Sequence, residues 1–181
     1  MKKNIFTLLL LSISLTCTNV PKVATISKEN GLKYIGETKE LLMGTLMKKI
    51  KENGTENALE FCNINAIPLT NSVSEKNNSF IKRVSDKNRN PINKATNDEL
   101  KIINYYKKKL LEKNELEAIV ENNKLYSPIV TNAMCLQCHG EIGKNIQPKT
   151  ADKIKMLYPK DLATAYKENE IRGLFVVELK N

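Results

Sequence analysis

The residues best suited to chemistry lie in one short segment, NAMCLQCHGEIG at positions 132–143. This segment holds two of the four cysteines and the single histidine of the 181-residue chain. Cys135, Cys138 and His139 form the pattern Cys-x-x-Cys-His, the attachment signature of a c-type haem. In such a site the two thiols bond to the porphyrin and the imidazole binds the iron. The sequence therefore predicts one covalently bound haem c.

Three other uses of the pair explain the segment less well. A structural zinc site needs about four protein ligands, and only Cys17 and Cys62 remain as further thiols. A thioredoxin-like pair belongs in a βαβ context, which nothing before Cys135 suggests. A disulfide between Cys135 and Cys138 is compatible with export but leaves His139 without a role.

A haem iron bound by one histidine has a second axial position, and no second histidine exists to occupy it. Met134 directly precedes Cys135 and can hardly reach the opposite face of the haem. A methionine ligand would raise the redox potential, whereas a Cys62 thiolate would lower it. Cys62 also suits the core as a small apolar residue. The candidates that remain open are Met43, Met47, Met134, Met156, Cys62, a lysine, a tyrosine and water.

The N-terminus predicts export. The basic MKK start precedes IFTLLLLSISL, an apolar run too short to span a bilayer, as in a signal peptide. The following SLTC resembles a loose lipobox, so we expect residues 1–16 to be removed and Cys17 to carry lipid; simple cleavage nearby is the alternative. Residues 17–29 would then form a tether, and the protein would be periplasmic and membrane-anchored. No second hydrophobic stretch is long enough to cross a membrane.

The charge of +9 restricts the partners. Lys2 and Lys3 fall in the predicted signal peptide, which leaves +7 on the mature chain. Lysines scattered over helices are typical of solvated faces, and there is no aromatic–basic interleaving. We therefore expect no nucleic-acid binding. The charge supports at most a mild preference for anionic membranes or an acidic partner protein, whose identity is unknown.

The elements that must position these residues point to one α+β domain over 30–181, with a small antiparallel sheet and flanking helices. Apolar spacing predicts a helix over 28–53 that ENG ends, with Met43 and Met47 on its apolar stripe. A second helix begins near Thr55 and places Cys62 on its apolar face. The other expected elements are strands at 79–86, 124–130 and 171–181, a helix from 96 with a Thr96–Glu99 capping box, a loop at 88–93, and a short helix at 158–170 with Pro159 in its first turn.

Four segments together resemble a known bacterial haem-domain family: ALEFCNINA, IKRVSDKNRNPIN, CLQCHG and YPKDLATAY with IRG. This domain of unknown function was first described structurally in a cyanobacterial c-type haem protein, and it also occurs as an input domain of sensor kinases. The resemblance covers about 30–181 and implies a PAS-like fold. It also implies Cys135 and Cys138 as thioether sites, His139 as the proximal iron ligand and Cys62 as the second.

Two further segments resemble structural signatures of that family around the haem. They are the loop from Arg89 to Asn93 and the turn from Tyr158 to Asp161. Ordinary loop and capping chemistry explains Asn90, Asn93 and Asp161 equally well. The chain ends at Asn181, so we expect no attached kinase domain.

These observations favour a sensor of redox state or of a small ligand that works by exchange of Cys62 at the iron. The alternative is a periplasmic electron-transfer cytochrome, which would keep both axial ligands. A haem peroxidase ranks last, because it needs a distal acid–base residue and no distal histidine is available. We therefore expect no enzymatic activity.

Overall fold

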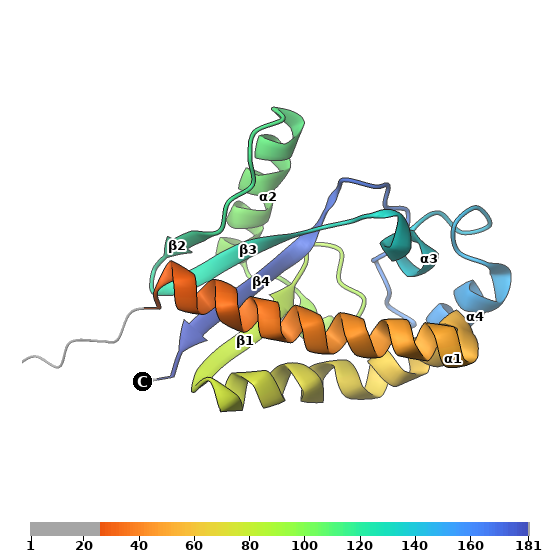
Figure 1. The fold of residues 1–181 in the computed structure, drawn as a ribbon. Coiled ribbons are helices and arrows are strands. Elements are labelled where there is room, and N and C mark those ends of the chain that lie inside the picture. Colours follow the sequence, from red (N-terminus) through yellow and green to blue (C-terminus); the bar gives the residue numbers. More distant parts are fainter. Residues whose placement is uncertain (1–25, 181) are drawn as a thin grey trace, which may run out of the picture.

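The computed structural model describes residues 26–180, and its first element is a long helical hairpin, α1 (Lys28–Lys76). Ser27 caps its start by accepting a hydrogen bond from the Asn30 amide at 3.1 Å. At Gly54 the backbone adopts φ 78° and ψ 175°, a conformation essentially restricted to glycine, and the helix reverses there. Figure 1 shows the two arms, 28–53 and 55–76, lying side by side. Two helices divided at ENG are thus confirmed, although the second arm extends beyond Pro68 to Lys76.

Four antiparallel strands form the sheet, in the order β1-β4-β3-β2. They are β1 (Ser79–Val84), β2 (Ile119–Glu121), β3 (Lys124–Val130) and β4 (Ile171–Leu179). β4 is the most apolar strand and pairs with both β1 and β3, which agrees with its buried central position. β2 was not predicted, because it has only three residues; a two-residue turn with positive φ at Asn122 and Asn123 joins it to β3.

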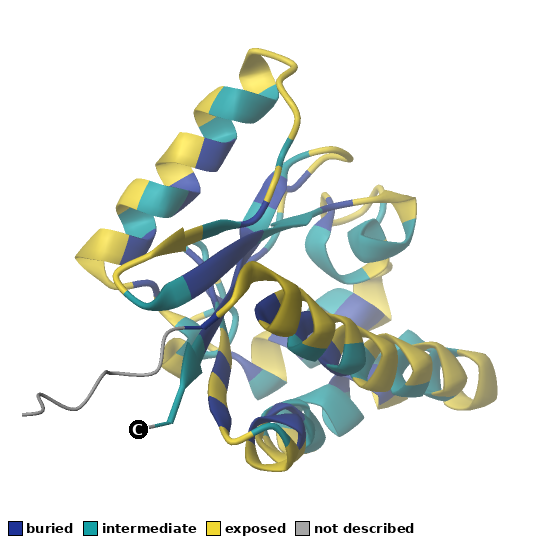
Figure 2. Cartoon of the chain, turned by 60° about the vertical axis from the view of Figure 1, so that its left-hand side comes forward, coloured by how far each residue is buried: buried dark blue, intermediate teal, exposed yellow. Residues whose placement is uncertain are grey.

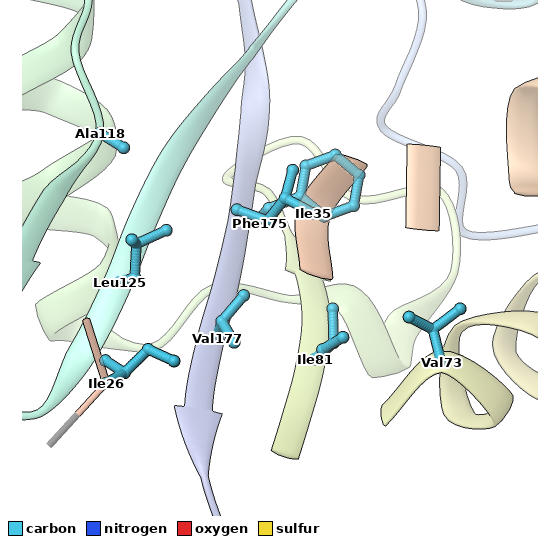
Figure 3. Packing of buried hydrophobic residues seen from close by; sticks show 8 residues of the cluster. All are labelled: Ile26, Ile35, Val73, Ile81, Ala118, Leu125, Phe175 and Val177. Atoms are coloured by element: carbon cyan, nitrogen blue, oxygen red, sulfur yellow. The ribbon is translucent and has the colours of Figure 1, made fainter. Parts of the chain in front are cut away.

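Successive side chains along the strands point to opposite faces of the sheet and belong to two hydrophobic clusters, one on each face. On one face, Phe175 and Val177 of β4 pack with Ile35 and Val73 from the two arms of α1 (Figure 3). On the other face, residues including Leu174 and Val176 pack against α2 (Asn97–Leu111). Figure 2 shows the buried residues concentrated in the sheet and the exposed ones along the outer sides of the helices.

The α2 helix begins as its sequence predicts. Thr96 accepts a hydrogen bond from the Glu99 amide, and the Glu99 carboxylate accepts one from the Thr96 amide, which completes the capping box. On the face that α2 turns toward the sheet, Ile103 and Tyr106 are fully buried in the cluster beneath the helix.

The helix expected at 158–170 is wrong. Those residues form an irregular loop, in which Asp161 donates its amide to the Tyr158 carbonyl, and Ala165 and Asn169 take positive φ. The helix comes earlier, as α4 (Pro148–Leu157), with Pro148 in its first turn. The α+β fold with a small antiparallel sheet is confirmed.

In residues 26–180, no helix is both long and apolar enough to cross a membrane. The predicted signal peptide and Cys17 lie outside the described residues.

Candidate functional site

The Cys-x-x-Cys-His segment folds into two short helical turns at the end of β3. These are η2 (Ala133–Cys135), a single 3₁₀ turn, and α3 (Leu136–His139). Asn132 fixes the start, because its side-chain oxygen accepts the Cys135 amide at 3.2 Å and lies 3.2 Å from the Cys135 sulfur. Cys135 and Cys138 are three residues apart in helical backbone and so lie on one side of the turn. Both are free, half-buried thiols.

His139 is held in one orientation. Its Nδ1 lies 2.7 Å from the Ala163 carbonyl oxygen, an acceptor, so Nδ1 carries the proton and donates it. Nε2 then has a free lone pair, as a metal-binding imidazole requires. Burial lowers the pKa of His139 well below its ordinary value, and the positive charges of Arg172 and Arg89 act in the same direction. The imidazole is therefore neutral at physiological pH.

The 158–166 loop lies over the motif and is tied to it by backbone bonds. Tyr166 donates its amide to the His139 carbonyl at 2.9 Å, and Ala165 donates to Gly140 at 2.8 Å. The Tyr166 ring meets the His139 ring edge-on, with centroids 6.3 Å apart. In an ordinary helix, the amides of Ala165 and Tyr166 would donate to carbonyls of that same helix. Because they donate to Gly140 and His139 instead, the segment is an irregular loop.

Arg89 joins three segments at this point. Its Nε and Nη2 donate to the two Asp161 carboxylate oxygens, both at 3.1 Å, and Nη2 also donates to the Cys138 carbonyl at 2.6 Å. Side-chain exposure is only 10% for Arg89 and 8% for Asp161. A buried bidentate pair of this kind fixes position strongly. The two segments that resembled family signatures thus meet directly and hold the motif.

Cys62 reaches the motif from the second arm of α1. Leu59, one turn earlier, clusters with Ile146 and Ile154, and Cys138 packs against this cluster. Burial raises the pKa of Cys62, with Arg83 and Arg89 opposing it. Burial also raises the pKa of Cys138, to about 11, and the neighbouring Cys62 contributes in the same direction. The structure therefore brings Cys62, more than seventy residues away in sequence, into the surroundings of the motif.

The start of the second arm is fixed against α4. The Glu56 carboxylate accepts a hydrogen bond from the Thr150 hydroxyl at 2.7 Å, and Glu60 forms an ion pair with Lys153. Figure 1 shows α3 and α4 at the end of the molecule where the α1 hairpin turns. Beside Cys62, a pocket of about 340 Å³ opens between the second arm, η1 (Pro91–Asn93) and the 158–160 turn, with Asn63, Arg89 and Tyr158 in its lining.

The methionines considered as iron ligands occupy less sheltered positions. Met43 and Met47 are 36% and 45% exposed on the first arm of α1, so they do not fill the core as their stripe suggested. Met156 is 63% exposed on α4, and Met134 is half-buried beside Cys135.

Sequence reasoning overlooked Arg83 and Arg172 and named Arg89 only as the start of a family-like loop. The chain has three, Arg83, Arg89 and Arg172, among 29 basic residues, and all three lie around the motif and Cys62. The signal in the sequence was the small number of arginines among many lysines, because arginine is preferred over lysine for buried contacts with carboxylates.

Within residues 26–180, no group of three or more His, Cys, Asp or Glu side chains is arranged to hold a metal ion directly. The zinc alternative therefore gains no support from the part of the chain that the structure describes.

The comparisons with known proteins agree with this architecture. The model of the Tll0287-like family matches residues 19–179. The chain belongs to the Tll0287-like family. Its structure is similar to the crystal structure of the cyanobacterial heme-protein Tll0287, with a TM-score of 0.59 and 20% sequence identity over 82% of this chain and 91% of that one. The resemblance seen in the sequence and the PAS-like fold are thus confirmed. No curated protein matches the chain.

Proposed function

We propose that this Tll0287-like chain is an exported c-type haem protein that senses redox state or a small ligand. Cys135 and Cys138 would attach the haem, His139 would bind the iron, and Cys62 would be the second, exchangeable ligand. One observation carries the proposal: in a Cys-x-x-Cys-His turn with two free thiols, the His139 Nδ1 is tied to the Ala163 carbonyl and Nε2 remains available.

The residues present fit a haem better than a bare ion. A haem c needs two thiols on one side of a turn, an imidazole beside them and an apolar wall, and Leu59, Ile146 and Ile154 supply such a wall next to Cys138. The heme-protein description of the solved relative points the same way. When bound, the haem would supply an iron that holds a thiolate better in the ferric than in the ferrous state.

The chain's own residues would convert that preference into a signal. The Ala163 carbonyl, Arg89 and Asp161 keep His139 and the motif in place. Cys62 lies instead on the second arm of α1, whose reversal depends on the single residue Gly54. Release of the thiol would remove the link between this arm and the haem, while Glu56 and Glu60 keep the start of the arm on α4 and the histidine side stays fixed. A partner protein could detect the resulting shift of the arm beyond Glu60.

Electron transfer is the second candidate function. Asn132, Ala133 and Gln137, which surround Cys135, are exposed, so a haem edge attached there would be within reach of a redox partner. An electron carrier would retain both axial ligands in both redox states. A peroxidase activity has no acid–base histidine to support it, since His139 is the only one.

The first experiment tests for covalent haem and its ligands. Produced with cytochrome c maturation machinery, the protein should retain haem through acid–acetone extraction, and Cys135→Ala or Cys138→Ala should weaken or abolish that retention. Optical spectra of the ferric and ferrous protein then distinguish thiolate, thioether and open-site ligation. A mature, correctly exported protein with the mass of the bare polypeptide would refute the haem assignment.

A further inference from the structure

Two of the three arginines, Arg83 and Arg172, lack the partner that Arg89 has. In the Arg89–Asp161 pair the guanidinium binds both oxygens of a carboxylate through Nε and Nη2. Neither Arg83 nor Arg172 lies within 4 Å of a carboxylate oxygen in the described chain. Buried guanidinium groups are ordinarily paired, because burying an unpaired charge is costly.

The contacts of these two arginines are few and involve neutral groups. Arg83 donates from Nη2 to the Ala66 carbonyl at 3.3 Å, one helical turn beyond Cys62. Arg172 donates from Nη1 to the Ser85 hydroxyl at 2.8 Å and to the Lys87 carbonyl at 3.1 Å, and its guanidinium lies over the Tyr166 ring, 5.3 Å from the centroid. The Nε of each is buried and has no hydrogen-bond partner. Each guanidinium therefore retains a donor with nothing to receive it.

Nearby carboxylates do not reach these two arginines. Asp161 is held by Arg89, and Asp86 forms an ion pair with Lys107 through Oδ2, while its buried Oδ1 has no hydrogen-bond partner in the described chain and makes no ion pair with Arg83 or Arg172. Burial lowers the pKa of both Arg83 and Arg172, and Arg172 adds to the effect on Arg83 because the two charges repel. Two buried guanidinium groups that repel each other and lack some of their hydrogen bonds are unfavourable unless an anion binds between them.

The position of the pair indicates which anion this is. Arg83 contacts the Ala66 carbonyl one helical turn beyond Cys62, and the Arg172 guanidinium lies 5.3 Å from the centroid of the Tyr166 ring, which meets His139 edge-on. The two cations thus adjoin the two proposed iron ligands. A haem carries two propionate carboxylates, which arginine binds through parallel N–H donors.

We propose that Arg83 and Arg172 bind the haem propionates and so set how the haem lies between His139 and Cys62. This role rests on the proposed haem function. It explains why the three arginines of a lysine-rich chain all lie near the motif and Cys62. Arg89 holds the 158–166 loop, and Arg83 and Arg172 would bind the cofactor.

The test uses the mature holoprotein and the propionate bending bands in its resonance Raman spectrum. Arg83→Gln and Arg172→Gln should each shift these bands while the covalent attachment stays intact. Lys124→Gln removes the same charge from the same sheet, at a partly exposed ion pair with Glu178, and should leave the bands in place. Arg83→Lys and Arg172→Lys keep a cation without the planar fork and should give smaller shifts than the glutamine variants.

The outcomes separate this inference from the proposed function. Haem that is attached and axially ligated as expected, with propionate bands unchanged in both glutamine variants, would overturn the propionate site and leave the haem assignment standing. A wild-type protein that carries no haem would refute both the haem assignment and the propionate site. If a glutamine variant does not accumulate as holoprotein, the corresponding lysine variant decides: a shifted band supports the site, and an unshifted one rejects it.

Discussion

At the scale of single residues, the two proposed iron ligands are held very differently. His139 is fixed by the Ala163 carbonyl, by backbone bonds through His139 and Gly140, and by the Arg89–Asp161 pair behind Cys138. Cys62 is a half-buried free thiol on the second arm of α1, and burial raises the pKa of that thiol. A ligand with few bonds of its own is the one expected to leave.

The first prediction tests Cys62 as the second ligand. Cys62→Ala should abolish the thiolate features of the ferric spectrum and leave the haem attached through Cys135 and Cys138. Cys62→Met should raise the reduction potential by on the order of 0.1 V, because a neutral thioether favours ferrous iron and axial ligands span roughly 0.8 V in all. Potentiometric titration with optical detection measures both effects.

Met43→Leu is the matched control for Cys62, since it removes a sulfur from the other arm of α1. It should leave the ferric spectrum unchanged. The reverse result, a normal spectrum in Cys62→Ala and an altered one in Met43→Leu, would place Cys62 in the core and make the methionine the ligand.

At the scale of elements, the reversal of α1 at Gly54 decides where Cys62 lies. Gly54 has φ 78° and ψ 175°, so a side chain there is strained. Gly54→Ala should lower the free energy of unfolding by about 1–3 kcal/mol. Gly44→Ala, in the middle of the first arm with open space around its Cβ position, should raise it by about 1 kcal/mol. Urea unfolding followed by circular dichroism measures both; equal effects would mean that Gly54 is not required for the turn.

A second element-scale prediction concerns the capping box of α2. Burial acts to raise the pKa of Glu99, but hydrogen bonds from Lys82 and the Thr96 amide outweigh it, so the pKa is lowered from 4.5. A carboxyl whose pKa falls on folding stabilises the protein above its unfolded pKa and loses that contribution as the pH drops through the folded value. The stability advantage of wild type over Glu99→Gln should therefore be full at neutral pH and shrink below about pH 4.5.

Urea titrations at several pH values test this prediction. Thr96→Ala should cost about 1 kcal/mol at neutral pH through loss of the cap. Asp98→Asn changes an exposed carboxylate in the same first turn. A hydrogen bond from Lys101 lowers the pKa of Asp98 as well, but solvent screens this pair, so its pH dependence should be weaker than that of Glu99→Gln. A Glu99→Gln difference that does not vary with pH would show that the carboxylate charge contributes nothing.

What the sequence could predict at this scale depended on how local the signal was. The capping box, the strands β1, β3 and β4 and the division of α1 all follow from neighbouring residues, and each is confirmed. The 158–166 loop could not be predicted, because its shape depends on Arg89, 72 residues from Asp161. The same holds for the site: three motif residues follow from their spacing, whereas the contacts of Arg83 and Arg172 arise only on folding.

At the scale of the whole molecule, α2 lies on one face of the sheet and α1, which carries Cys62, lies on the other. α2 covers one face through a continuous apolar cluster. On the other face, α1 contributes to the core through its first arm and the end of its second, while the part around Cys62 adjoins the motif, α4 and the pocket beside Asn63. A signal from the iron would therefore travel through the second arm of α1 rather than through α2.

Anchoring to the membrane is a whole-molecule prediction that concerns Cys17. If Cys17 carries lipid, the mature wild type should partition into the detergent phase, and Cys17→Ser should be soluble or remain unprocessed. Phase separation and intact mass of the exported protein measure this. A wild-type protein found only in the aqueous phase and cleaved beyond Cys17 would instead indicate an ordinary signal peptide.

The final prediction separates sensor from carrier by asking whether the second arm of α1 loosens on reduction. Hydrogen–deuterium exchange of the holoprotein should be at least about tenfold faster around residues 58–66 in the ferrous than in the ferric state, which corresponds to about 1.4 kcal/mol of lost protection. Residues 97–111 of α2 serve as the internal reference and should exchange equally in both states. In Cys62→Ala the arm should exchange at the faster rate whatever the redox state, because no iron–sulfur bond remains to break. Equal exchange in both states of the wild type, with thiolate bands retained on reduction, would reject the switch and favour electron transfer.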